Sequence, residues 1–272
     1  MFGYVPPVSR KPVLWAEAGV LVGQEGASRV PEWLLTADAS HQRSSRRGLI
    51  LDLDDTLYPR ERFVRSGLAA VARHVGLHHG VDSSAAYALM TRATAVGGSG
   101  KEFQALCERF DLPPAIVPGL VDVFRMHTPS LFLSREAAET LRALRADGWA
   151  LAILTNGLPS VQFRKVAALG LTEFVDEVVY AEEHAPGGKP SAAPFQAALR
   201  GLELSAGQCV CVGDDAARDV RGARALGIPT IRMARHGVSV ERADEADTVI
   251  SSLRQLPAAA GLLMSMVTAD VA

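Results

Sequence analysis

Residues 49–59 read LILDLDDTLYP, an apolar run that contains three carboxylates. Its leucines, isoleucine and tyrosine are typical of a strand that is buried inside a sheet. Asp52, Asp54 and Asp55 interrupt this run, and burying a carboxylate is costly unless a partner compensates its charge. The run therefore predicts a buried strand that ends beside a bound cation.

The composition is ordinary for a soluble globular protein. The 272 residues suffice for one large domain, or for a core domain with a smaller companion. Charged residues make up 21% of the chain, and a net charge of −2 offers no basic face to nucleic acid. No apolar stretch approaches the length of a membrane span. We expect no nucleic-acid or membrane partner, and the sequence leaves the oligomeric state open.

The three cysteines are too few and too irregularly spaced for a disulfide framework or a zinc site. Cys209 and Cys211 lie in an apolar run and are interpreted as core residues of a protein from a reducing compartment. Residues 10–22 faintly resemble a signal peptide, but Pro12, Glu17 and Gly19 interrupt them and no clean cleavage site follows. We therefore expect a cytoplasmic protein.

From residue 49 onward, short apolar segments alternate with segments of helical periodicity. The expected strands lie at residues 49–54, 149–156, 177–182, 208–214, 229–234 and 247–251. The expected helices between them lie at residues 135–147, 159–170, 194–202 and 216–227. Strands that are apolar on both faces and alternate with helices indicate a parallel sheet covered on both sides. The predicted fold class is therefore α/β, with a doubly wound, Rossmann-like parallel sheet.

A long helical insertion interrupts this alternation after the first strand. About ninety residues separate the first two strands, far more than an ordinary βα connection contains. We expect an inserted α-helical domain at 62–134, beside the carboxylates, where it can cover a ligand at the carboxyl ends of the strands. The α/β core then comprises 48–61 and 135–255, with a poorly readable extension at 1–47 and a tail at 256–272.

Asp52 and Asp54 are spaced for metal binding. Residues two apart in a strand point to the same side, so the two carboxylates should converge. Such close charges repel each other, and Mg²⁺ relieves the repulsion because it prefers one or two carboxylates with water and phosphate oxygens. Alone this spacing is a weak signal, since Asp-Asp-Thr also caps helices well.

Polar residues that suit a phosphate group follow the second and third predicted strands. Thr155 and Asn156 end the second strand, where their hydroxyl and amide, with the backbone of Gly157, can bind phosphate oxygens. Lys189 lies in the loop GGKP after the third strand and offers a cation for the negative charge. Thr-Asn-Gly and Gly-Lys-Pro are common in ordinary turns as well, so neither pattern decides the matter by itself.

The fourth predicted strand also ends in acids. Asp214 and Asp215 follow it directly and Asp219 comes one helical turn later, which offers a second source of metal ligands. Gly-Asp-Asp is by itself a common helix cap. The joint occurrence of all these patterns, in this order and at successive strand ends, indicates one site.

DLDDT, LTNG, GKP and GDDAARD resemble, in this order, the four motifs of the haloacid dehalogenase-like hydrolase superfamily. The resemblance covers roughly residues 48–252, and the helical insertion looks like the C1 cap of that superfamily. It implies that Asp52 is a nucleophile that forms an aspartyl-phosphate. It also implies that Asp54 first protonates the leaving oxygen and then activates water as a base. Mg²⁺ would be bound by Asp52, the backbone carbonyl of Asp54 and Asp214.

The resemblance also implies roles for the remaining motif residues. Thr155 and Lys189 would bind the transferring phosphoryl group, and Lys189 would neutralise the nucleophile. Asp219 would orient Lys189 or bind a water attached to the metal. Asp215 would contact the residues that bind the metal and not the metal itself.

The expected function is a Mg²⁺-dependent phosphatase that acts on a small phosphorylated metabolite. Dehalogenases of the superfamily usually lack an acid two residues after the nucleophile, so Asp54 favours a phosphatase or a phosphomutase, of which mutases are the narrower class. Two non-enzymatic alternatives stay open: a phosphate-accepting module similar to a response-regulator receiver, and a non-catalytic protein that binds a partner through residues 1–47. Turnover distinguishes an enzyme from both.

The glycine-rich stretch VGGSGKE at 96–102 does not form a phosphate-binding loop, because Ala95 and Glu102 replace the glycine and the hydroxyl residue that such a loop requires. We interpret it as a loop between helices of the insertion, where Lys101 or Arg92 can touch the substrate.

Overall fold

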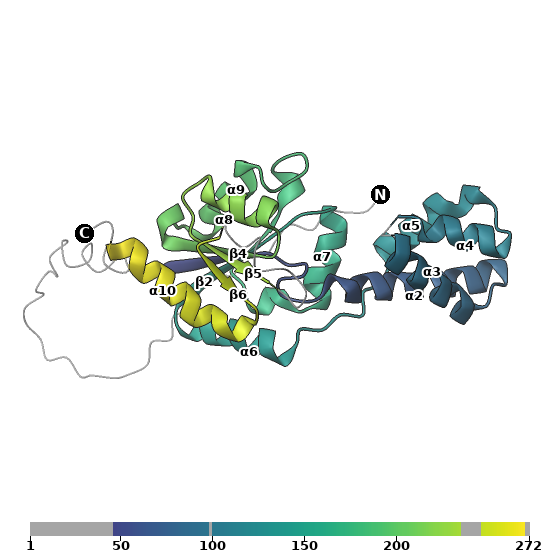
Figure 1. The fold of residues 1–272 in the computed structure, drawn as a ribbon, viewed down its shortest axis with the longest axis horizontal. Helices are drawn as coiled ribbons and strands as arrows, with labels where there is room; N and C mark the ends of the chain where they lie inside the picture. Colours follow the sequence, from purple (N-terminus) through teal and green to yellow (C-terminus); the bar gives the residue numbers. More distant parts are fainter. Residues whose placement is uncertain (1–45, 98–99, 235–245, 270–272) are drawn as a thin grey trace, which may run out of the picture. The chain divides into compact units, whose positions relative to one another are not determined.

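A six-stranded parallel sheet organises the described part of the chain (Figure 1). The structure is a computed structural model that describes residues 46–97, 100–234 and 246–269. The strands are β1 Arg47–Leu51, β2 Trp149–Thr155, β3 Glu177–Tyr180, β4 Cys209–Gly213, β5 Thr230–Met233 and β6 Thr248–Ile250. Their order is β3-β2-β1-β4-β5-β6, and every neighbouring pair is parallel. The predicted doubly wound α/β sheet is confirmed.

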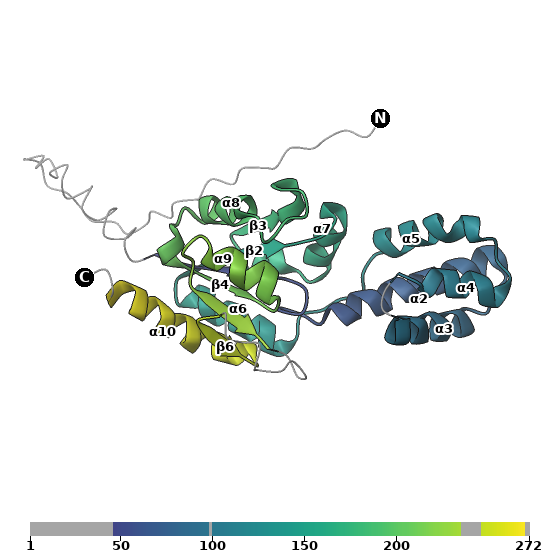
Figure 2. The same ribbon diagram turned by 45° about the horizontal axis from the view of Figure 1, so that its top comes forward.

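Helices cover both faces of this sheet (Figure 2). They are α6 Arg135–Ala146, α7 Pro159–Ala168, α8 Ala192–Leu202, α9 Arg221–Arg224 and α10 Leu256–Ala269. Leu49 and Leu51 of β1 pack in one hydrophobic cluster with α6, α7 and α10, whereas Ile50 packs in a second cluster with α8 and α9. This alternation follows from the pleat of the strand and explains why β1 is apolar throughout.

The strand order places β1 at the point where the chain reverses its direction across the sheet. Leu51 pairs with Ile153 of β2 on one side and with Val212 of β4 on the other. The residues that follow these three strands therefore lie at the same edge of the sheet. In open α/β sheets, ligands bind at this reversal point, outside the carboxyl ends of the strands.

The first strand ends earlier than predicted, at Leu51 and not at residue 54. The amide of Asp52 still donates to the carbonyl of Val212 at 2.8 Å, but Asp55 then adopts a left-handed conformation with φ of 61°. Asp54 pairs with Tyr58 in an isolated bridge across the resulting turn. The pleat rule that predicted converging side chains for Asp52 and Asp54 does not apply beyond Leu51.

The insertion after β1 consists of helices with a hydrophobic core of their own. These are α2 Arg60–His79, α3 Ser83–Gly97, α4 Glu102–Phe110 and α5 Val117–Met126. Their shared cluster contains Leu68, Val71, Val75, Met90, Leu106 and Leu120, all fully or almost fully buried. The separate cluster is what a small helical domain requires. Its predicted limits, and its role as a cap, stay predictions.

The structure differs from the prediction at the carboxyl terminus. Residues predicted as a tail form α10, and Leu256, Ala260 and Leu263 lie in the same core cluster as Leu49 of β1. Their spacing of three to four residues puts them on one face of a helix, which packs on the sheet. The predicted extension falls almost wholly on residues 1–45, outside the described ranges. Among the described residues, no helix combines the length and the apolarity needed to cross a bilayer.

Candidate active site

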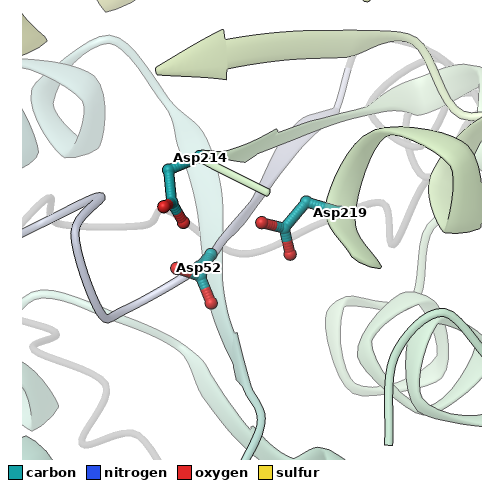
Figure 3. Close-up of side chains that lie close together, drawn as sticks. All are labelled: Asp52, Asp214 and Asp219. Atoms are coloured by element: carbon teal, nitrogen blue, oxygen red, sulfur yellow. The ribbon is translucent and has the colours of Figure 1, made fainter. Parts of the chain in front are cut away.

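Three carboxylates meet at the carboxyl edge of the central strands (Figure 3). Asp52 follows β1, Asp214 follows β4, and Asp219 lies on the π-helical turn Ala216–Val220. Each contributes one oxygen to a group whose members all lie within 4.8 Å of one another. Oxygen donors of this kind suit a hard divalent cation such as Mg²⁺. The sequence predicted that Asp219 orients Lys189 or binds a water attached to the metal, and the structure places its carboxylate both in this group and in contact with the ammonium of Lys189.

The approach of Asp219 depends on its neighbours in the turn. A Cβ at Gly213 would lie only 2.2 Å from Oδ2 of Asp219, so this position accepts no side chain without a shift of the carboxylate. Asp215, predicted to support the metal ligands, builds the turn: its side chain accepts hydrogen bonds from the amides of Ala217 and Arg218 at 2.8 and 2.9 Å. Its own amide donates to Oδ2 of Asp219 at 3.1 Å.

Lys189 is the cation that lies beside Asp52 and Asp219. Its ammonium is buried and donates to Oδ1 of Asp52 at 2.7 Å and to Oδ1 of Asp219 at 2.6 Å. The ammonium also donates a third hydrogen bond, to the backbone carbonyl of Leu154 at 2.8 Å. Burial alone would lower the pKa of Lys189, but the two carboxylates outweigh burial and raise it above its ordinary value. Lys189 therefore stays charged at any physiological pH.

The carboxylates nevertheless outnumber this cation. Burial raises the pKa of Asp52 from 3.8 to about 7, opposed by Lys189 and reinforced by Asp219. Burial and the charge of Asp219 likewise raise the pKa of Asp214 to about 6. Both shifts mean that the protein alone compensates the ionised acids incompletely. The donor set therefore fits an additional divalent cation.

Thr155 offers a polar group that the protein itself leaves unused. The residue is 1% exposed, and its Oγ1 has no hydrogen-bond partner within the described residues. A buried hydroxyl without a partner is costly, and in a native structure it calls for an explanation. A ligand oxygen bound at the end of β2 would supply the missing partner, in agreement with the prediction that Thr155 binds a phosphoryl group.

Asn156 is used differently from the prediction. Its amide donates to the carbonyls of Gly187 and Lys189 at 3.1 and 3.0 Å, and its oxygen accepts from the amide of Lys189 at 2.9 Å. The side chain that was expected to bind phosphate thus anchors the loop that carries Lys189. Gly157 follows with φ of 114° and lines a pocket together with Asp52 and Lys189. That its backbone binds phosphate stays a prediction.

Asp54 has partners that the sequence analysis missed. The hydroxyl of Tyr58 donates to Oδ1 at 2.5 Å, and the ammonium of Lys165 donates to Oδ1 and Oδ2 at 2.9 and 2.6 Å. Lys165 lies on α7 between the buried residues Val161 and Val166. The sequence did contain a signal for this contact, because Lys165 lies on the apolar face of a predicted helix. A lysine in such a position is rarely buried without a charged partner.

One pocket of about 800 Å³ is lined by the charged and polar site residues Asp52, Asp54, Thr155, Asn156, Lys165, Lys189, Asp214, Asp215 and Asp219. The helical insertion contributes Phe63 and Val64 of α2 with Phe124 and Arg125 of α5. The predicted substrate contacts Lys101 and Arg92 are not among the residues that line it, so the insertion reaches the pocket through other side chains.

The sequence also matches a known family over the region that builds this site. The model of the haloacid dehalogenase-like hydrolases matches residues 47–227, well over half of the chain. The chain belongs to this family. The resemblance carried by the four motifs is thus confirmed, and this haloacid dehalogenase-like protein is an enzyme of the hydrolase class.

Curated relatives of this haloacid dehalogenase-like hydrolase include named phosphatases. Glyceraldehyde 3-phosphate phosphatase of Methanocaldococcus jannaschii is 31% identical over 218 residues, which cover 77% of this chain and 95% of that protein. Ribulose-1,5-bisphosphate 5-phosphatase of Halopiger xanaduensis is 31% identical over 217 residues, covering 74% of this chain and 90% of that protein.

A solved structure of a different activity is also similar. 2-Haloacid dehalogenase from Pseudomonas syringae pv. Tomato DC3000 superposes with a TM-score of 0.53 at 27% identity, covering 84% of this chain and all of that one (100%). The same fold therefore carries phosphatases and dehalogenases, and the residues of the site have to distinguish the two reactions.

Proposed function

We propose that this protein is a Mg²⁺-dependent phosphatase that hydrolyses a small phosphomonoester through an aspartyl-phosphate. The observation that carries the proposal is the group of three carboxylates, Asp52, Asp214 and Asp219, two of which share the single ammonium of Lys189. This excess of negative charge requires a further cation, as metal-dependent phosphoryl transfer does. The activities named for the two curated relatives support the same reaction class.

The proposed first step uses Asp52 as the nucleophile. Its Oδ1 is held by Lys189, and its Oδ2 accepts a hydrogen bond from Thr56 at 3.1 Å. As a carboxylate oxygen bonds to phosphorus, the bond from phosphorus to the leaving oxygen breaks, and Asp54 gives its proton to that oxygen. Asp54 then takes a proton from a water molecule, whose oxygen bonds to phosphorus as the bond from phosphorus to Asp52 breaks; inorganic phosphate is released, and the proton on Asp54 serves the next turnover. The hydroxyl of Thr155 and the ammonium of Lys189 stabilise the charge that develops on the phosphoryl oxygens.

Asp52 and Asp214, with the backbone carbonyl of Asp54 and the nearby Asp219, would hold the metal. Bound there, Mg²⁺ neutralises charge on the phosphoryl oxygens and on the acids. Asp54 favours this reaction over dehalogenation, because an acid beside the nucleophile serves a leaving group that needs a proton. Phe63, Val64, Phe124 and Arg125 line the pocket from the helical insertion and support its proposed role as a cap that encloses a small metabolite.

Phosphate release tests the proposal directly. The full-length protein is assayed with a panel of phosphomonoesters that includes glyceraldehyde 3-phosphate and ribulose 1,5-bisphosphate, with Mg²⁺ and with a chelator. We expect turnover that requires Mg²⁺, and the ranking of substrates names the metabolite. Halide release from 2-haloacids without phosphate release would identify a dehalogenase. A folded protein that binds Mg²⁺ but turns over neither class would favour the phosphate-holding or partner-binding alternative.

Mg²⁺ is expected to raise the Tm more at pH 8 than at pH 5. The raised pKa values of Asp52, about 7, and Asp214, about 6, mean that the metal-free folded protein holds protons there which the unfolded chain loses near pH 4. Stability of the metal-free protein therefore falls as the pH rises from about 4 to about 7. Mg²⁺ binds the deprotonated acids and offsets this loss where they are ionised. Thermal unfolding with and without Mg²⁺ at both pH values measures the effect, and equal shifts would contradict it.

Replacing Thr155 with valine is expected to separate activity from stability. Because Oγ1 has no partner within the described residues, valine removes a buried unsatisfied group at nearly constant volume, and the Tm should not fall. Loss of one donor to the transferring phosphoryl group should lower kcat by about 10²-fold. Thr155→Ser keeps the hydroxyl and serves as the matched control. A destabilised Thr155→Val protein with full turnover would show that the hydroxyl has a structural role.

A further inference from the structure

Lys165 is a buried cation that lies outside the group of Asp52, Lys189, Asp214 and Asp219. Its side chain is 4% exposed, on the buried face of α7, and its ammonium contacts both oxygens of Asp54. The ammonium also lies 4.5 Å from the ring centroid of Phe63, in the first turn of α2. Lys165 thus joins three segments: the turn after β1, the helix after β2, and the start of the helical insertion.

A purely structural role explains this arrangement poorly. Burial lowers the pKa of Lys165, and the carboxylate of Asp54 opposes that shift. Buried ion pairs of this kind are often replaced by apolar residues without loss of stability. The carboxylate of Asp54 is not enclosed in the core either: its side chain is 20% exposed and lines the pocket that Asp52 also lines. The ion pair therefore fixes an acid that faces the pocket.

The contacts of Asp54 fix its orientation from several sides. Tyr58 and Lys165 both donate to Oδ1, and Lys165 also donates to Oδ2. The amide of Gln162 lies 3.4 Å from Oδ2 and donates to the carbonyl of Asn156 as well. Since the side chain of Asn156 anchors the Lys189 loop, a continuous set of contacts joins the proposed acid to the cation beside the nucleophile. Catalytic groups need such support, because an error of about 1 Å in position is costly.

We infer that Lys165 is a positioning residue that holds the carboxyl group of Asp54 on the leaving-group side of the pocket, with Phe63 covering its ammonium. The inference rests on the proposed phosphatase function. In the step concerned, the bond from phosphorus to the leaving oxygen breaks, the proton of the Asp54 carboxyl moves to that oxygen, and Lys165 keeps its own protons. Lys165 should therefore matter only when the leaving oxygen needs a proton.

The dependence of kcat/KM on the leaving group tests this inference. For a reaction through an aspartyl-phosphate, kcat/KM reports only the steps up to formation of that intermediate. Lys165→Met is compared with the wild type on the fastest alkyl phosphate of the panel and on 4-nitrophenyl phosphate, whose leaving group departs without a proton. We expect kcat/KM to fall on the order of 10- to 100-fold for the alkyl phosphate, which is at most the lower limit of the 10²- to 10⁴-fold that a general acid contributes, because Asp54 itself is retained. For 4-nitrophenyl phosphate we expect a fall of less than about 3-fold, because that step needs no acid.

Further variants test whether Lys165 acts through Asp54 and control for the loss of an ion pair. Asp54→Asn should show the same selectivity, and adding Lys165→Met to it should cause no further loss for the alkyl phosphate, because the two residues act as one unit. Lys165→Arg retains the cation and should recover part of the lost activity. Arg145→Met removes a cation that pairs with Asp176 outside the pocket and controls for the loss of an ion pair.

The outcomes separate this inference from the function on which it rests. A wild type that hydrolyses neither substrate overturns the proposed function and this inference with it. A wild type that is active, with a Lys165→Met protein that loses activity equally on both substrates, overturns the positioning role alone. Additive losses in the double variant would also overturn it, since Lys165 would then act independently of Asp54.

Discussion

Asp52→Asn is expected to abolish turnover, with a loss of about 10⁴-fold or more, while the folded protein keeps or gains stability. The amide of asparagine is not a nucleophile towards phosphorus, so the variant lacks the oxygen that forms the aspartyl-phosphate. Phosphate release with Mg²⁺ on the best substrate of the panel measures the loss. Asp147→Asn, at an acid that pairs with Arg47 outside the pocket, is the matched control and should retain full activity.

The stability of the Asp52→Asn protein follows from the pKa of the residue that is replaced. Burial raises the pKa of Asp52 to about 7, so the ionised form destabilises the metal-free folded state above that pH. Asparagine removes that charge, and the Tm at pH 8 without Mg²⁺ should equal or exceed that of the wild type. Opposite changes in activity and stability are typical of a residue that is kept for function. Residual turnover within about 10-fold of the wild type would contradict the assignment of Asp52 as the nucleophile.

The strands and the place of the site were predictable because both follow from short-range rules. Segments such as 149–156 are apolar on both faces, which is the pattern of a central parallel strand. Carboxyl ends of parallel strands meet at one edge, so Thr155 and Asp214, 59 residues apart in the chain, were expected in one site beside Asp52. The pocket lined by all three side chains agrees with that expectation.

The details that the sequence did not reveal depend on backbone geometry and on long-range contacts. β1 ends at Leu51, so Asp54 lies in the turn after the strand, where Asp55 adopts a positive φ that is uncommon for a residue other than glycine. Asp219 lies on a π-helical turn, where the periodicity of the sequence had predicted a regular helix over 216–227. The partner of Asp54, Lys165, lies 111 residues away on another helix, and no periodicity in the sequence connects the two.

Lys189→Met is expected to cost both stability and activity, in contrast to Asp52→Asn. The ammonium of Lys189 is 3% exposed as a side chain and donates to both Asp52 and Asp219. Removing one partner of a buried ion pair leaves an uncompensated charge, which typically destabilises a protein by about 3–5 kcal/mol. The loss of a cation aimed at the transferring phosphoryl group should also lower kcat by about 10²- to 10³-fold. Chemical denaturation at pH 7 without Mg²⁺ measures the first effect, and phosphate release measures the second.

The pH dependence and a second substitution show whether charge causes this loss of stability. Without Lys189 the carboxylate of Asp52 loses its nearest opposite charge, so its pKa should rise further and the variant should be most destabilised near pH 8 and least near pH 5. Adding Asp52→Asn should then restore part of the lost stability, because one of the two uncompensated acids becomes neutral. Mg²⁺ should stabilise Lys189→Met more than the wild type for the same reason. If the loss of stability in Lys189→Met is independent of pH and unaffected by Asp52→Asn, Lys189 has a packing role instead. That result would also contradict the argument that the buried carboxylates of this site require a cation because of their charge.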